Sequence, residues 1–155
     1  MKKLILVIAL GFAAILSVAP AQAANDSATV NVTINLTSKC VFGAIAPVAF
    51  TYTSFQGTAS TATGGTFNMK CTNTMPYKIG FTNTATPATT DAVTDDAVNL
   101  AYTLGLSATT GTGSGVDQAY TVTGTMAAAQ AGTCLTAACT NTAATNKTRT
   151  IYVVY

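Results

Sequence analysis

Apolar and polar residues alternate along most of this chain, and this alternation is the feature that most restricts its fold. It is clearest in the segment ATVNVTINL, from Ala28 to Leu36, where one face is apolar and the other carries only Thr and Asn. A period of two residues is that of a β-strand with one buried face. The apolar face of this first predicted strand comprises Ala28, Val30, Val32, Ile34 and Leu36.

Further strands are predicted from the same alternation, and clusters of Gly, Asn, Pro and Thr separate them. They cover residues 39–52 (broken by Gly43 and Pro47), 64–73, 77–83, 98–107, 118–126 and 148–155. Polar loops are expected at 85–96 and 109–117, and a helical turn at 126–131. No segment has the period of an amphipathic helix. Short strands at this spacing predict an all-β antiparallel sandwich.

The first 23 residues have the pattern of a signal peptide. Lys2 and Lys3 precede an apolar run of about a dozen residues, which is shorter than a membrane span, and Ala21-Gln22-Ala23 provides a cleavage site. We expect cleavage after about Ala23 and export of the mature chain. Two of the seven cationic residues lie in this leader. The mature chain therefore has five cationic residues and five Asp residues, and its net charge is close to zero. It therefore has no basic field to attract nucleic acid.

Four cysteines in an exported chain favour two disulfides, and three pairings are possible. Cys134 and Cys139 are close in sequence and are the expected local pair, which leaves Cys40 with Cys71. A metal site in the CLTAAC segment is the alternative. It is disfavoured because the chain has no His and the spacing suits no common zinc motif.

The residue types argue against an enzyme, and no cofactor is expected. The chain has neither His nor Glu, so the usual base for a Ser or Cys nucleophile is missing. The GTGSG segment at 111–115 lacks the helix that would follow a nucleotide-binding loop, and a hairpin loop is favoured there. Asp91, Asp95 and Asp96 could ligate calcium, but a solvated loop is the preferred interpretation.

Four aromatic residues at strand spacing could line a ligand groove, but aromatic residues in such positions usually belong to the core. They are Tyr77, Phe81, Tyr102 and Tyr120. We therefore expect them to be core residues.

The layout of the chain resembles the spore coat protein U domain, the fold of the major pilins of archaic chaperone–usher pili. A signal peptide is followed by an alternating strand and SKCVFG. GGTFNMKCTNTMPYKIGFTN, LAYTLGLS and YTVTGTM come later, and the final strand ends on an aromatic residue. The resemblance rests on the order Cys40, Gly65, Cys71-Thr72 and Tyr77, together with the two terminal strands.

The resemblance implies an immunoglobulin-like sandwich that lacks its last strand. A periplasmic chaperone would fill the resulting groove first. At an outer-membrane usher, the N-terminal strand of the next identical or related subunit would then replace the chaperone. The chain would divide into a signal peptide (1–23), a donor-strand extension (24–39) and a pilin domain (40–155). Cys40 would pair with Cys71, and Ile151, Val153 and Tyr155 would lie on the edge strand beside the groove.

The implied function is that of a structural subunit of a pilus at the cell surface, which serves adhesion and biofilm formation. The alternative is a self-complete secreted sandwich, a binding module or coat protein whose first strand folds onto its own domain. The chain departs from the family before its last strand. In place of a Gly-x-Tyr-x-Asp-like element, Gly132 is followed by the second Cys pair, and Arg149 lies near the acidic position.

Overall fold

The structure is a computed structural model that describes residues 25–155, so the expected signal peptide lies outside the described residues. Two units are distinguished, an extension up to Asn35 and a larger unit from Leu36 to Tyr155. Residues 25–39 have no regular secondary structure, and their side chains are exposed. Among residues 25–155, no helix is long and apolar enough to cross a membrane.

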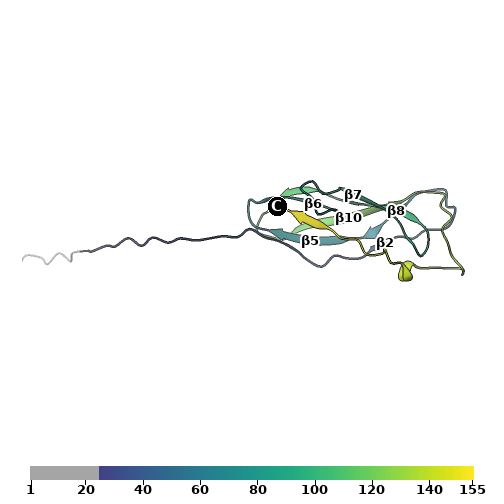
Figure 1. Ribbon diagram of the computed structural model, residues 1–155, viewed down its shortest axis with the longest axis horizontal. Helices are drawn as coiled ribbons and strands as arrows, with labels where there is room; N and C mark the ends of the chain where they lie inside the picture. The colour runs from purple at the N-terminus through teal and green to yellow at the C-terminus, as the bar shows by residue number, and fades with distance from the viewer. Residues whose placement is uncertain (1–24) are drawn as a thin grey trace, which may run out of the picture. The chain divides into compact units, whose positions relative to one another are not determined.

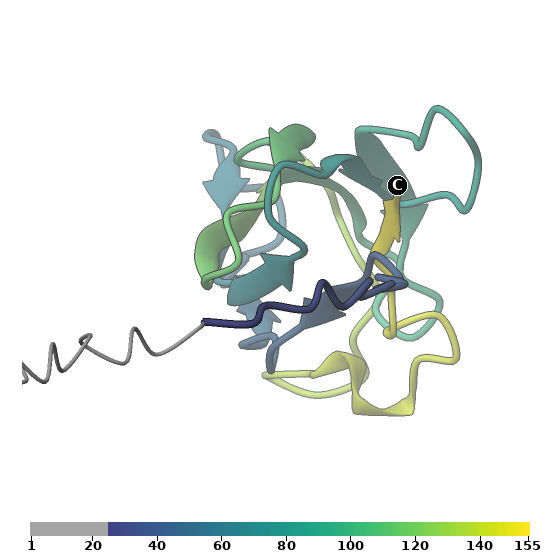
Figure 2. The same ribbon diagram turned by 90° about the vertical axis from the view of Figure 1, so that its left-hand side faces the viewer.

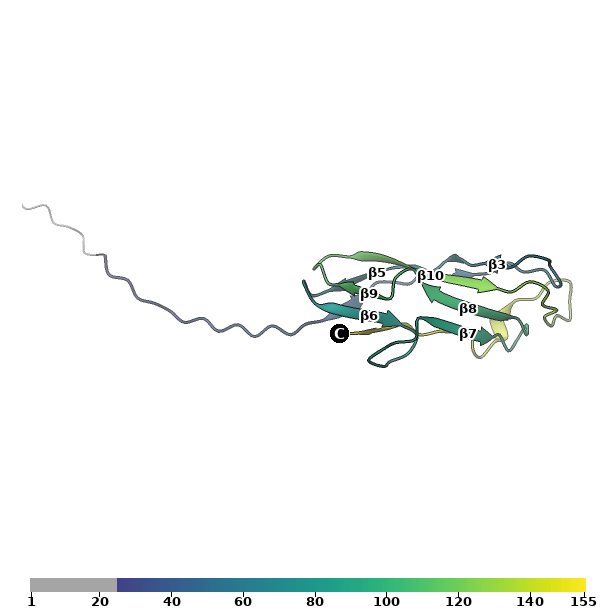
Figure 3. The same ribbon diagram turned by 90° about the horizontal axis from the view of Figure 1, so that it is seen from above.

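The larger unit contains a six-stranded antiparallel sheet in the order β1-β5-β10-β8-β7, with β3 also paired to β10 (Figures 1 and 3). Its strands are β1 (Cys40–Phe42), β3 (Ser60–Thr61), β5 (Thr66–Cys71), β7 (Thr90–Thr94), β8 (Ala101–Leu106) and β10 (Gln118–Met126). β1 and β7 lie at opposite ends of this strand order and are edge strands, and β3 lies at a further edge beside β10.

A three-stranded antiparallel sheet, in the order β11-β6-β9, forms the second layer. It consists of β6 (Pro76–Gly80), β9 (Thr110–Thr112) and β11 (Tyr152–Val154), and a small pair joins β2 (Val48–Ala49) to β4 (Thr63–Gly64). The 3₁₀ helix η1 (Asn141–Ala143) projects from one side of the sandwich, which Figure 2 views along its strands. The predicted all-β antiparallel sandwich is confirmed.

Strand alternation builds the core between the layers, as the sequence predicts. Along β5 the buried residues are Phe67, Met69 and Cys71, and the residues between them are exposed. Tyr77 of β6 and Tyr120 of β10 face each other and share a hydrogen bond between their hydroxyl groups. Burial is the main cause that raises the pKa of the Tyr77 phenol, and the contact with Tyr120 adds to the effect.

Both disulfides are present with the predicted pairing. Cys40 is bonded to Cys71, which fastens β1 to β5 at directly opposed positions of the sheet. Cys134 is bonded to Cys139 and closes a short surface loop. The four cysteines of the described chain are therefore all paired.

Three expectations about local structure are wrong. The expected loops at 85–96 and 109–117 contain β7 and β9. Apolar and polar residues alternate only weakly in these segments, but pairing with β8 and β6 supplies the main-chain hydrogen bonds that make them strands. The expected helical turn at 126–131 is the end of β10 followed by a tight turn, with Ala129 in a left-handed conformation (φ 63°). Residues 28–36 have no regular secondary structure in the single chain, and their role as a donor strand, which needs a second copy as its neighbour, stays a prediction.

Candidate functional site

An apolar groove of about 690 Å³ runs along the sandwich unit, between the chain that follows β1 and the chain that leads into β11. Its floor belongs to the larger sheet: Leu104, Val122 and Met126 are buried, and Tyr102 is partly buried. Val48 and Phe50, both partly buried, form one wall. The floor therefore presents core side chains to the groove.

The opposite wall is polar and comes from the segment between the second disulfide and β11. Its residues are Cys139, Thr140, Asn141, Lys147, Thr148 and Arg149. One wall follows β1 in the chain, and the other leads into β11. Both are edge strands, β1 of the larger sheet and β11 of the smaller one. Within residues 25–155, no further strand occupies either outer edge. An edge strand offers unpaired main-chain groups that another strand can use.

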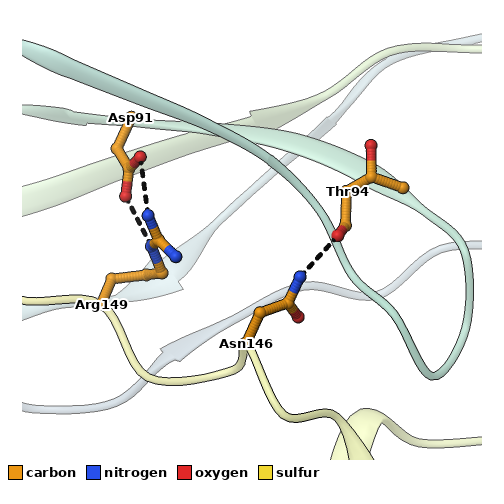
Figure 4. Close-up of polar contacts among 4 residues, drawn as sticks. All are labelled: Asp91, Thr94, Asn146 and Arg149. Atoms are coloured by element: carbon orange, nitrogen blue, oxygen red, sulfur yellow. Dashed lines mark hydrogen bonds and ion pairs between the residues drawn. The ribbon is translucent and has the colours of Figure 1, made fainter.

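The polar wall is attached to β7 by side chains, as Figure 4 shows. Arg149 donates two hydrogen bonds to the carboxylate of Asp91, from Nε to Oδ2 (2.6 Å) and from Nη2 to Oδ1 (3.0 Å). This bidentate bond raises the pKa of the Arg149 guanidinium. Asn146 Nδ2 donates to the carbonyl oxygen of Thr94 (2.7 Å).

The turn after β7 adds two more attachments through neighbouring carboxylates. Asp95 is 2% exposed and accepts bonds from the amides of Ala97 (2.9 Å) and Val98 (3.0 Å) and from Asn141 Nδ2 (3.0 Å). Asp96 accepts bonds from the hydroxyl and the amide of Thr145. The hydroxyl bond is the main cause that lowers the pKa of Asp96.

These contacts correct the expectation of a solvated acidic loop. Asp91, Asp95 and Asp96 each bind a different partner from the C-terminal segment, and Asp95 is buried. The carboxylates do not converge, and no group of three metal-ligating residues occurs in the described part of the chain.

The predicted edge-strand residues lie where the smaller sheet ends. Ile151 and Val153 are partly buried and pack against the core, whereas Tyr155 follows β11 and is 59% exposed. Only three residues of the predicted strand 148–155 pair as β11. Of the four aromatic residues considered for a ligand groove, only Tyr102 lines it. Tyr77 and Tyr120 are core residues, and Phe81 packs against the core.

The apolar face of the N-terminal segment is almost fully exposed. Val30, Val32, Ile34 and Leu36 have exposed fractions of 76–83%. Isolated apolar residues on a surface are ordinary, but four exposed apolar residues at alternate positions of one segment are unusual. The polar attachments of the groove wall were not found from the sequence, because each joins residues about 50 positions apart.

Comparison with known proteins identifies the domain. The family model for the Spore Coat Protein U domain matches residues 26–155. Comparisons with curated proteins and with solved structures gave no match. The family match extends from the exposed N-terminal segment to the last residue of the chain, and so covers the extension, the groove and both disulfides. The chain therefore belongs to the Spore Coat Protein U domain family.

Proposed function

We propose that this protein is a structural subunit of a surface pilus, and that neighbouring copies join by donor-strand exchange. The observation that carries the proposal is a pair of complementary surfaces in one chain. One is the apolar groove beside the segment that leads into the edge strand β11, and the other is the exposed apolar face of residues 28–36. The resemblance of the family to chaperone–usher pilins supports the same conclusion.

An extended segment that docks in the groove would bury its apolar side chains on the floor and pair its backbone with a sheet edge. Each Val, Ile or Leu side chain that is buried in this way contributes about 1.5–3 kcal/mol. A segment of one copy that docks in the groove of the next is a heterologous contact, and such contacts produce open filaments. A periplasmic chaperone would occupy the groove before assembly. The donor segment of the next subunit would replace the chaperone at an outer-membrane usher.

The two disulfides are consistent with export to an oxidising compartment. Adhesion to surfaces and biofilm formation are the roles we propose for the fibre. The chain would act through assembly rather than through catalysis, and it would need no cofactor.

The test is a substitution that changes one face of the donor segment only. Ile34→Asp places a charge on the apolar face, and Asn35→Asp places the same charge on the opposite face. The mature protein is oxidised, incubated at high concentration, and examined by electron microscopy and on a denaturing gel without boiling. The original sequence and Asn35→Asp should give fibres and a heat-sensitive ladder of oligomers, whereas Ile34→Asp should give neither.

Fibres formed equally well by Ile34→Asp would reject the donor assignment. A folded monomer of the original sequence that never assembles would instead favour the self-complete sandwich, a binding module or coat protein.

A further inference from the structure

The C-terminal segment before β11 lies along the free edge of β7 in antiparallel register. Arg149 binds Asp91, Asn146 binds the carbonyl oxygen of Thr94, and Thr145 binds Asp96. Asn146 precedes Arg149 by three residues, and its partner Thr94 follows Asp91 by three residues. This spacing is that of two neighbouring antiparallel strands. Arg149 and Thr145 bond to the carboxylates of Asp91 and Asp96, whereas Asn146 bonds to main-chain groups.

Asn146 is the clearest case of a side chain that takes the place of a strand backbone. Its Nδ2 donates to the carbonyl oxygen of Thr94 (2.7 Å), and its Oδ1 accepts a bond from the amide of Asp96 (3.3 Å). The carboxamide therefore offers one donor to the last residue of β7 and one acceptor to the turn after it, as a peptide group of an adjacent strand does. The bidentate bond between Arg149 and Asp91 fixes the same segment three residues further on (Figure 4).

The donor segment is three times as long as the strand β11 that would receive it. Nine residues, 28–36, span about 30 Å when extended, whereas the three residues of β11 span about 10 Å. β11 alone can therefore pair with only a third of the donor. The segment that continues β11 upstream lines the groove through Lys147, Thr148 and Arg149.

Resting on the function proposed above, we infer that Asn146 and Arg149 form a latch that holds residues 147–150 beside β7 as the upstream half of the acceptor edge. The donor segment of a second copy then pairs along residues 147–154 and not along β11 alone. Asn146 and Arg149 are positioning residues in this view, since their polar groups bind β7 while the segment they hold meets the donor.

The test uses the full mature chain with a second copy of residues 28–36 appended after Tyr155 through a short Gly–Ser linker. Hydrogen exchange is followed amide by amide, with and without the appended segment. The appended segment should slow exchange both in β11 and in residues 147–151. Asn146→Ala should speed exchange in residues 147–151 by about tenfold, the factor that corresponds to 1.4 kcal/mol. β11 should stay protected.

Two controls separate the latch from a general loss of stability. Asn83→Ala removes the same side chain from an exposed loop and should change neither region. Arg149→Gln should repeat the effect of Asn146→Ala. Lys70→Gln, which breaks the exposed ion pair with Asp117 (3.8 Å), should not.

Equal protection of residues 147–151 with and without Asn146 would overturn the latch. Loss of protection throughout β11 and the core in the Asn146→Ala variant would overturn it also, because the effect would then be global. An appended segment that protects neither region would instead overturn the donor-strand function itself.

Discussion

Removing the two disulfides separately should have unequal effects on stability. Cys40–Cys71 closes a loop with a sequence separation of 31, whereas Cys134–Cys139 closes one of 5. The entropy that a cross-link removes from the unfolded chain grows with the logarithm of the loop length. This relation predicts losses of about 4 kcal/mol for the first bond and about 2 kcal/mol for the second at 25 °C.

The positions of the bonds act in the same direction as the loop lengths. Cys71 is 1% exposed and belongs to the core, whereas Cys134 and Cys139 lie in an exposed loop. Loss of the first bond therefore also disturbs packing between β1 and β5, and loss of the second does not reach the core.

The measurement is equilibrium unfolding in urea of two double variants, Cys40→Ala with Cys71→Ala and Cys134→Ala with Cys139→Ala, against the oxidised original. If the free energy of unfolding falls with urea concentration at the same slope in all three proteins, the values extrapolated to water can be compared directly. Equal losses, or a larger loss for the short loop, would refute the reasoning from loop length and burial.

Asp95→Ala should lower the free energy of unfolding by about 1–3 kcal/mol, because two backbone amides of the turn lose their acceptor inside the protein; thermal unfolding measures the loss. The lowered pKa of Asp96 contributes stability that is present above its ordinary value of 3.8 and is lost as the pH falls through the folded value. Thr145→Val should therefore flatten the acid limb of a plot of stability against pH, and an unchanged limb would contradict this. The raised pKa of Tyr77 contributes stability that is present below the ordinary value of 10.0 and is lost as the pH rises through the folded value. Tyr77→Phe should flatten the alkaline limb in the same titration, whereas an equally steep limb would argue against the assignment.

The core could be predicted from the sequence wherever a strand buries one face. Phe67, Met69 and Cys71 alternate with polar residues, and Gly43 and Pro47 interrupt the segment between β1 and β2 as expected. The strand β7 could not be predicted in this way. Its sequence TDAVT has little apolar character, and its pairing with β8 makes it a strand.

The groove and its polar wall depend on contacts that no local pattern contains. Asp95 stands beside another Asp in the sequence, which favours solvent exposure, but three hydrogen bonds from two segments satisfy its carboxylate inside the fold. Arg149 and Asp91 are 58 positions apart, and their bond becomes visible only when the chain is folded. The donor role of residues 28–36 remains a prediction, since a single chain contains no second copy to receive them.

The bond between Cys40 and Cys71 has a mechanical consequence. Tension applied through the N-terminal segment reaches the folded unit at β1, a three-residue strand at a sheet margin. Such a strand resists peeling poorly, because its few hydrogen bonds would break one after another. The disulfide transmits the force from β1 to β5, which has a strand on either side. Unfolding of the subunit by this force therefore requires that an interior strand be separated from its neighbours.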